Sequence, residues 1–236
     1  MALRPNKAKK ANYNYIEAKE NPNSYTTESI QKMVINLEYA NVDKSYKVIQ
    51  VTSTLSGEGK TTLVGNLSYL LLQKYKVLVV DMDLRKPKIH RLANDTNQDG
   101  LTDYLLDVIP FEQLIRNNNN GLDYIVAGQK TSSVNNVLRS KKLEDLINQL
   151  KERYDYIILD TPPVQVNADA LIISKLADGI VYVVGYNIVK KAMIHECIES
   201  LKRQNITMLG IAFTQVKLPK RRGLYHYYYD EANWCS

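Results

Sequence analysis

The stretch from residue 48 to residue 62, VIQVTSTLSGEGKTT, constrains the fold more than any other part of the chain. It begins as an apolar, β-branched run, continues through a loop with two glycines, and leads directly into an apolar helical pattern. A strand, a tight loop and a helix in this order are the context that a phosphate-binding loop requires. The motif for such a loop is G-x-x-x-x-G-K-[ST]; Gly59, Lys60 and Thr61 supply its end, and Thr54 replaces its first glycine.

The residue types in this loop suit the binding of a phosphate chain. Backbone N–H groups at a helix N-terminus converge on one spot, and the helix dipole favours an anion there. Lys60 is placed to reach the outer phosphates, and the hydroxyl of Thr61 is placed to bind Mg²⁺. We therefore predict that the loop binds a nucleotide through Ser56, Gly57, Glu58, Gly59, Lys60, Thr61 and Thr62. The alternative is an ordinary strand-to-helix turn with a surface lysine.

Apolar segments along the rest of the chain alternate between strand and helix patterns. Strands that alternate with helical segments predict an α/β fold, with a mostly parallel sheet flanked by helices. The predicted domain covers residues 24–216, between a flexible basic segment at 1–23 and a basic, tyrosine-rich tail at 217–236. The expected strands lie near residues 47–53, 76–80, 122–126, 156–159, 180–184 and 207–213.

The chain has 236 residues and a net charge of +6, which is concentrated in the short basic segments 1–20 and 217–222. Because no basic face spans the domain, we expect no nucleic acid partner. The two segments either contact anionic lipid or stay solvated, and the second is favoured. No apolar run approaches the ~18 residues of a membrane span, and the N-terminus lacks the apolar core of a signal peptide. These features predict a cytoplasmic protein.

Three aspartates follow predicted strands. Asp81 ends the second strand, Asp83 lies two residues further on, and Asp160 directly follows the strand at 156–159. In an open α/β sheet, ligands bind outside the carboxyl ends of the strands, so we expect these side chains to converge on Lys60. Asp160 suits metal binding beside a phosphate loop, whereas Asp81 and Asp83 suit a division between metal binding and proton acceptance. The alternative is that these aspartates only form turns and helix caps, as aspartates at strand ends commonly do.

The C-terminal segment RRGLYHYYYDEANWCS holds four tyrosines within five residues: Tyr225, Tyr227, Tyr228 and Tyr229. A segment with so little aliphatic content does not make a packed helix or strand. It is therefore interpreted either as an aromatic tail or lid that packs on a partner, or as a set of phosphate acceptors. A tyrosine hydroxyl has a pKa of about 10, so an acceptor tyrosine needs a carboxylate to take its proton.

These motifs, in this order, resemble the bacterial tyrosine kinases of capsular and exopolysaccharide biosynthesis, and are most similar to their Gram-positive cytoplasmic type. The resemblance covers roughly residues 25–229 and rests on the phosphate loop, DMDLRKP at 81–87, LDTPP at 159–163 and the terminal tyrosines. GLTDYL at 100–105 also matches. The resemblance implies a P-loop NTPase fold related to partition-type ATPases. It also implies an autokinase that uses ATP and Mg²⁺ to phosphorylate its own C-terminal tyrosines.

The resemblance further implies roles for single residues and for partners. Lys60, Asp81 and Asp83 would be catalytic, and Arg85 would steady a phosphate or contact a neighbouring subunit. A membrane activator protein, of the chain-length-regulator kind, would recruit the kinase to the inner face of the plasma membrane. Other copies of the chain and a cognate tyrosine phosphatase would be further partners. The metal would be bound by Thr61, Asp83 and Asp160.

The chain departs from the family pattern at several places. The family's N-terminal helix carries Glu-x-x-Arg-x-x-Arg, which supports ring assembly, but here Glu28 is followed by Gln31 and Val34. Thr214 stands where relatives often place an adenine-binding asparagine. Two other functions stay open, namely a partition-type ATPase that cycles on a surface and a non-catalytic nucleotide-binding adaptor. Leu55 argues against the first, because that group has a lysine at this position.

Overall fold

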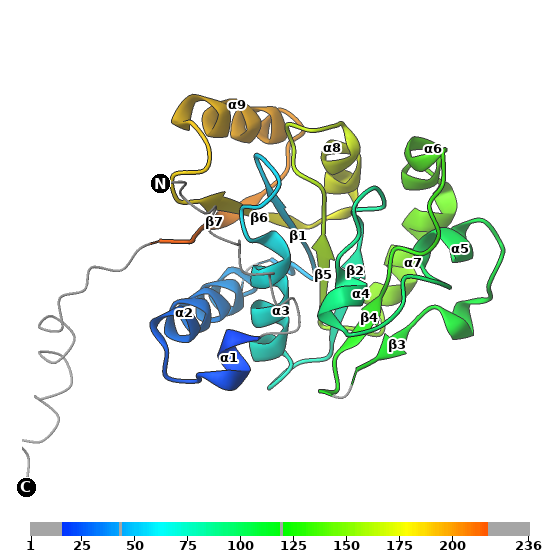
Figure 1. Cartoon of the computed structure of the whole chain (residues 1–236), viewed down its shortest axis with the longest axis horizontal. Helices are drawn as coiled ribbons and strands as arrows, with labels where there is room; N and C mark the ends of the chain where they lie inside the picture. Colours follow the sequence, from blue (N-terminus) through cyan, green and yellow to red (C-terminus); the bar gives the residue numbers. More distant parts are fainter. Residues whose placement is uncertain (1–15, 43, 119, 217–236) are drawn as a thin grey trace, which may run out of the picture.

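The computed structural model describes residues 16–42, 44–118 and 120–216, and its centre is a single β-sheet (Figure 1). Within these residues the sheet has seven strands in the order β3-β4-β2-β5-β1-β6-β7. Every neighbouring pair is parallel except β3 and β4, which are antiparallel. The strands are β1 (Val48–Ser53), β2 (Val77–Asp81), β3 (Arg116–Asn117), β4 (Asp123–Ile125), β5 (Tyr156–Asp160), β6 (Gly179–Gly185) and β7 (Met208–Thr214).

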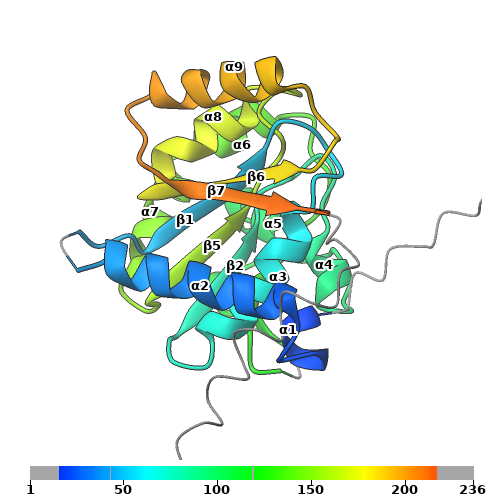
Figure 2. The same ribbon diagram turned by 90° about the vertical axis from the view of Figure 1, so that its left-hand side faces the viewer.

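Helices cover both faces of this sheet (Figure 2). Helices α2, α3 and α4 pack on one face, with α1 beside α3, and helices α5 to α9 pack on the other. The helices are α1 (Glu17–Glu20), α2 (Tyr25–Ala40), α3 (Lys60–Leu71), α4 (Ile89–Leu92), α5 (Leu101–Leu105), α6 (Val134–Leu138), α7 (Lys141–Lys151), α8 (Asp169–Ile173) and α9 (Lys191–Lys202), with 3₁₀ turns η1 (Phe111–Gln113) and η2 (Ser174–Leu176).

The central strands are buried on both faces, and this explains their continuous apolar sequences. In β2, Val77 and Val79 pack against the face of α2 to α4, whereas Leu78 and Val80 pack against the opposite helices. The predicted α/β fold with a mostly parallel sheet is confirmed. Six of the strands lie close to the predicted ranges, but β3 was not predicted, because a two-residue strand in an asparagine-rich stretch has no apolar pattern.

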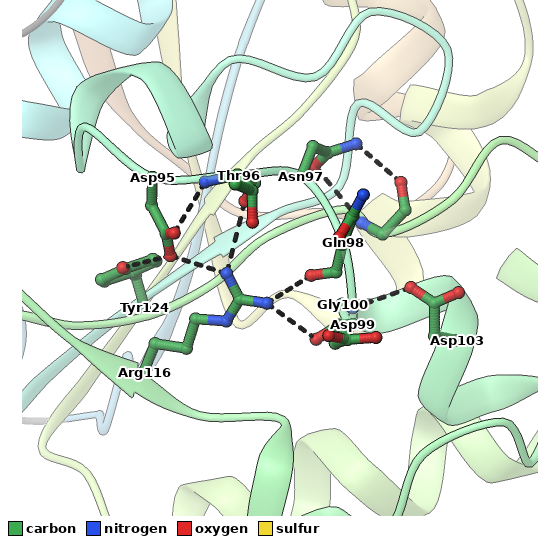
Figure 3. Close-up of polar contacts among 10 residues, drawn as sticks. Asp95, Thr96, Asn97, Gln98, Asp99, Gly100, Asp103, Arg116 and Tyr124 are labelled. Carbon is green, nitrogen blue, oxygen red and sulfur yellow. Dashed lines mark hydrogen bonds and ion pairs between the residues drawn. The ribbon is translucent and has the colours of Figure 1, made fainter.

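The short strand β3 holds the loop that follows α4 against the sheet (Figure 3). Arg116 Nη1 donates to Asp95 Oδ2 at 2.6 Å, and Tyr124 on β4 donates its hydroxyl to the same oxygen at 2.7 Å. Arg116 Nη2 donates to the carbonyl oxygens of Gln98 and Asp99. Arg116 Nη1 also donates to the carbonyl oxygen of Thr96 at 3.3 Å, so one guanidinium binds a carboxylate and three backbone carbonyls, which orders a loop that has no regular structure.

The GLTDYL segment at 100–105 has a structural role in this chain. A Cβ atom at Gly100 would collide with the backbone of Val126 and Gly128, so only glycine fits there. Asp103 Oδ2 accepts hydrogen bonds from the backbone N–H of Gly100 at 2.8 Å and of Gln129 at 3.1 Å. The segment therefore docks α5 onto the chain that follows β4.

Residues 16–23 correct the expectation of a flexible segment over residues 1–23. They contain α1, and Ile16 and Ala18 are buried. The backbone N–H of Ala18 donates to Asn66 Oδ1 on α3 at 2.8 Å, and Asn66 Nδ2 donates to the carbonyl of Thr62 at 2.8 Å. A helix of four residues is too short to show a hydrophobic period, so its docking is not visible in the sequence. Residues 1–15 lie outside the described residues.

Asn66→Ala should loosen α1 from α3. The variant loses the acceptor for the Ala18 N–H and leaves that buried donor unsatisfied, so we expect the free energy of unfolding to fall by about 1–2 kcal/mol. Urea denaturation measures this change, and limited proteolysis should cut faster within residues 16–23. Asn136→Ala, at an exposed position of α6, is the matched control. Equal stability and equal protection of both variants would contradict the docking of α1.

Candidate active site

The loop between β1 and α3 has a backbone shaped to hold an anion. Gly57 and Gly59 have φ angles of 86° and 90°, in the left-handed region that glycine adopts at little steric cost. A Cβ at Gly57 would meet no atom within 4 Å, so the surface of the loop is open there. No described side chain caps the first turn of α3. An anion is therefore a suitable partner for the N–H groups of that turn.

Lys60, the first residue of α3, has only 5% of its surface exposed. Its Nζ donates a hydrogen bond to Ser53 Oγ, at the end of β1, at 2.9 Å. Burial lowers the pKa of Lys60, and the negative charge of Asp160 opposes this shift by favouring the ammonium. The Lys60 side chain is therefore buried beneath the loop, where the charge of the Asp160 carboxylate favours its ammonium form.

Thr61 and Asp160 face each other where α3 meets the carboxyl end of β5. Thr61 Oγ1 donates a hydrogen bond to Asp160 Oδ2 at 2.7 Å. Burial raises the pKa of Asp160, while the bond from Thr61 and the charge of Lys60 act in the opposite direction. The structure therefore brings Asp160 to the loop, as its position at a strand end predicted.

Asp81 and Asp83 have different surroundings. Asp81 is fully buried, and its carboxylate accepts hydrogen bonds from the backbone N–H groups of Lys88 and Ile89 at 2.8 Å and of Asp83 at 3.2 Å. Burial, reinforced by the nearby charge of Asp160, raises the pKa of Asp81. Asp83 is half-buried, and its Oδ1 accepts from the N–H of Lys86 at 3.0 Å. Asp81 thus organises the chain leading into α4, whereas Asp83 faces solvent in part.

Arg85 is paired with Asp169, a contact that the sequence analysis did not predict. Its Nε donates to Asp169 Oδ2 at 2.6 Å, and its Nη2 donates to Asp169 Oδ1 at 3.3 Å. Asp169 is buried and begins α8, whereas 46% of the Arg85 side chain is exposed. This bidentate pair joins the chain after β2 to the chain after β5. Asp169 is thus the partner of the Arg85 side chain in the structure.

Glu58 was predicted to bind the nucleotide, but its side chain points into the protein. The side chain is fully buried, and Oε1 accepts from the N–H of Leu55 at 2.6 Å while Oε2 accepts from the N–H of Gly185 at 2.9 Å. Only the backbone of Glu58 remains for an anion. Thr54, the replacement for the first motif glycine, is also turned inward, and its hydroxyl bonds to Tyr182 Oη at 2.8 Å.

Gln215 and Lys88 lie near the loop but were not recognised from the sequence, and Thr214 was noted only as the residue at the adenine-binding position of relatives. Thr214 and Gln215, at the end of β7, donate side-chain hydrogen bonds to loop carbonyls. The positive charge of Lys88 lowers the pKa of both Lys60 and Asp160, which places it among the charges of the site. No local pattern marks them, because each reaches the loop only through the tertiary fold.

The remaining predicted site residues divide into two groups. Ser56, within the loop, and Thr62, in the first turn of α3, have exposed side chains. The predicted acceptors lie outside the described residues, and they are Tyr225, Tyr227, Tyr228 and Tyr229.

The protein side chains suit Mg²⁺ only in combination with a phosphate ligand. Among the described residues, no group of three or more His, Cys, Asp or Glu side chains is close enough to hold a metal ion. The Thr61 hydroxyl and the Asp160 carboxylate do form a pair of hard oxygen donors beside the open loop. Mg²⁺ commonly takes one or two protein oxygens together with phosphate oxygens and water. The donor set therefore fits a magnesium–nucleotide complex.

Comparison with known proteins places this geometry among nucleotide-dependent kinases. Residues 46–193 match a family described as an AAA domain. The chain is 34% identical over 238 residues to the tyrosine-protein kinase YwqD of Bacillus subtilis (strain 168), with 100% of both chains covered.

Solved structures agree with this comparison. The crystal structure of the chimerical protein CapA2B2 is similar with a TM-score of 0.83 and 29% identity, covering 86% of this chain and 90% of that one. The septum site-determining protein MinD of Pyrococcus horikoshii, solved with Mg-ADP, has a TM-score of 0.60 and 24% identity over 70% of this chain and 68% of its own. The second similarity shows the fold, a P-loop fold of the kind that MinD has.

Asp160→Asn should stabilise the nucleotide-free protein at alkaline pH. The folded state raises the pKa of Asp160 from 3.8 to about 6, so its charged form costs stability. This cost builds up as the pH rises from 3.8 to about 6 and is complete above that range. Asparagine keeps an acceptor for Thr61 but carries no charge. We expect the melting temperature of the variant to exceed that of the wild type at pH 8, by an amount that shrinks toward pH 5.

Thermal denaturation across this pH range, without nucleotide, measures the difference. The matched control is Asp145→Asn, because Asp145 is an exposed carboxylate on α7 whose ion pair with Lys141 lies at the surface. That change should stay within about 0.5 kcal/mol of the wild type. A variant at position 160 that is less stable than the wild type at pH 8 would show that the buried charge is favourable.

Proposed function

Because the chain belongs to the bacterial tyrosine-protein kinases of capsule and exopolysaccharide biosynthesis, we propose that it transfers the γ-phosphate of ATP to tyrosines of its own C-terminal tail. The observation that carries the proposal is the arrangement of Lys60, Thr61 and Asp160 beside an uncapped helix N-terminus. The described chain leaves β7 next to this loop and ends at Val216, which supports a tail that starts close to the site. The proposed acceptors are Tyr225, Tyr227, Tyr228 and Tyr229.

In this proposal the loop binds the phosphates and the side chains hold the charges around them. The backbone of residues 56–59 and the first turn of α3 bind phosphate oxygens, and Lys60 turns from Ser53 to the outer phosphates. Thr61, Asp83 and Asp160 hold Mg²⁺, directly or through water. The metal, when bound, neutralises charge that develops on the transferred phosphoryl group.

Asp81, at the end of β2, and Asp83, two residues further on, have different roles in this proposal. Asp81 is proposed to accept the proton of the attacking tyrosine hydroxyl, which requires its charged form. Burial raises the pKa of Asp81 and disfavours that form, whereas a bound cation would favour it. The partly exposed Asp83 suits metal binding. Arg85 steadies the loop of both aspartates through Asp169, and its exposed face remains available to a phosphate or a neighbouring subunit.

The partners and the cellular location belong to the same proposal. Within the described ranges, no helix is both long and apolar enough to cross a bilayer. A solved relative is a chimerical protein whose name, CapA2B2, joins two parts, which supports association with a second polypeptide. We propose a cytoplasmic kinase that a membrane activator of the polysaccharide machinery recruits to the inner face of the plasma membrane. A cognate tyrosine phosphatase would reverse the reaction.

Self-association is proposed without the arginine contacts of the family's ring. Gln31 is exposed on α2, but Val34 is 8% exposed and packs in the core with Ile30 and Leu37. An arginine at position 34 would have to place its charge within that apolar cluster. Any assembly of this chain must therefore use other contacts than those two arginines.

A phosphosite map tests the proposed function. After incubation with Mg-ATP and an activator peptide, mass spectrometry should find phosphate on tyrosines within residues 225–229. Lys60→Met removes the ammonium that binds the outer phosphates, so it should abolish the signal. Substitution of the four tail tyrosines by phenylalanine should remove the phosphate while ATP binding stays intact.

The matched control is Tyr39→Phe, because Tyr39 is 72% exposed on α2 and carries an accessible hydroxyl outside the tail. This variant should keep the full tail signal. ATP hydrolysis without phosphotyrosine would instead support a partition-type ATPase. ATP binding with neither hydrolysis nor transfer, at any activator concentration, would support an adaptor.

A further inference from the structure

Side chains at the end of β7 form hydrogen bonds to the backbone of the phosphate loop. Thr214 Oγ1 donates a hydrogen bond to the carbonyl oxygen of Glu58 at 2.6 Å, and Gln215 Nε2 donates to the carbonyl oxygen of Gly57 at 2.7 Å. A Cβ atom at Gly59 would come within 3.2 Å of Thr214 Oγ1. Two consecutive side chains of one strand end thus bind two consecutive carbonyls of the loop.

This contact has a direct consequence for the N–H groups of the loop. A trans peptide unit is planar, and its C=O and N–H bonds point in opposite directions; the described chain has no cis peptide bonds. When the carbonyls of Gly57 and Glu58 point toward β7, the N–H groups of Glu58 and Gly59 point away from it. Those two N–H groups belong to the part of the loop that the motif assigns to phosphate binding.

The buried carboxylate of Glu58 holds the same part of the loop from below. Its two oxygens accept from Leu55, within the loop, and from Gly185, at the end of β6. Gly185 is paired with Thr214 in the β6–β7 ladder. The residues that bind Glu58 through its side chain and through its carbonyl oxygen are therefore neighbours in the sheet. Gln215 has a φ of 57°, which bends the backbone out of the strand direction just where its side chain meets the loop.

We propose that Thr214 and Gln215 are positioning residues for phosphate binding, which orient the Glu58 and Gly59 N–H groups by fixing the carbonyls behind them. We call this pair the loop clamp. The proposal rests on the proposed nucleotide-binding function and deepens it. It also gives Thr214 a different role from the base recognition expected at this position, because its hydroxyl proton is already donated to the loop.

The two roles for Thr214 predict different ligand dependence. A residue that orients the phosphate cradle affects every ligand with a phosphate chain, whether or not a base is attached. A residue that reads adenine affects ATP but not inorganic tripolyphosphate, and it changes the preference for ATP over GTP. Calorimetric titration with Mg-ATP, Mg-GTP and magnesium tripolyphosphate therefore separates the two.

Thr214→Val removes the hydroxyl and keeps the shape of the side chain. We expect affinity for ATP, GTP and tripolyphosphate to fall by a similar factor of about 3- to 10-fold, the effect of one lost hydrogen bond. Thr214→Ser, which keeps the hydroxyl, should bind all three ligands like the wild type. A changed ATP-to-GTP ratio with unchanged tripolyphosphate binding would overturn the proposal in favour of base recognition. Unchanged binding of all three ligands would overturn it as well.

Gln215→Met provides a second variant whose fold is not at risk, because Gln215 is exposed. Methionine has nearly the same length as glutamine but cannot donate the hydrogen bond. We expect the affinity for each of the three ligands to fall by about 2- to 3-fold. The loss is small because water partly replaces a hydrogen bond at an exposed position. These titrations do not depend on phosphate transfer. If the wild type binds ATP and phosphorylates its tail while both variants bind the three ligands normally, the loop-clamp proposal is wrong but the proposed function stands. If the wild type binds no phosphate ligand, the proposed function fails with it.

Discussion

The carboxylates of Asp81 and Asp160 are buried at paired positions of neighbouring parallel strands, and much of the site can be understood from this constraint. Burial disfavours the charged form of each, and for Asp81 the charge of Asp160 adds repulsion. Backbone N–H groups bind Asp81, the Thr61 hydroxyl binds Asp160, and the charges of Lys60 and Lys88 favour the ionised form of Asp160. Such a site is poised for a divalent cation, which would favour both charged forms. Buried carboxylates with raised pKa values of this kind are typical of functional sites.

The sequence was sufficient to place the main-chain elements around this site. Apolar runs such as VLVVD and YIILD are buried on both sides, so they predict parallel strands, and the carboxyl ends of parallel strands necessarily share one edge. The positions of Asp81, Asp160 and Lys60 follow from that rule alone. The short elements α1 and β3 were not predicted, because they contain too few residues to show a hydrophobic period.

Side-chain directions within loops could not be predicted in the same way. Glu58 lies in the middle of a phosphate-binding motif, yet its carboxylate is held by Gly185, which is 127 residues away in the sequence. Arg85 is likewise held by Asp169, 84 residues away. Thr54 is tolerated in place of a glycine because Tyr182 accepts or donates a hydrogen bond beneath the loop. Each of these contacts depends on which strands are neighbours, and no local pattern carries that information.

The fold that this chain shares with MinD does not by itself determine the choice of a tyrosine acceptor. The acceptor must come from parts outside the shared strand, loop and helix, and the proposed acceptors follow β7. The same strand ends in the loop clamp, whose two side chains hold carbonyls of the phosphate loop. Gln215 lies ten residues before Tyr225 in the sequence, so the loop clamp and the proposed acceptors belong to one segment of the chain. In the proposed function, this one segment of sequence both orients the N–H groups of Glu58 and Gly59 and supplies the acceptor tyrosines.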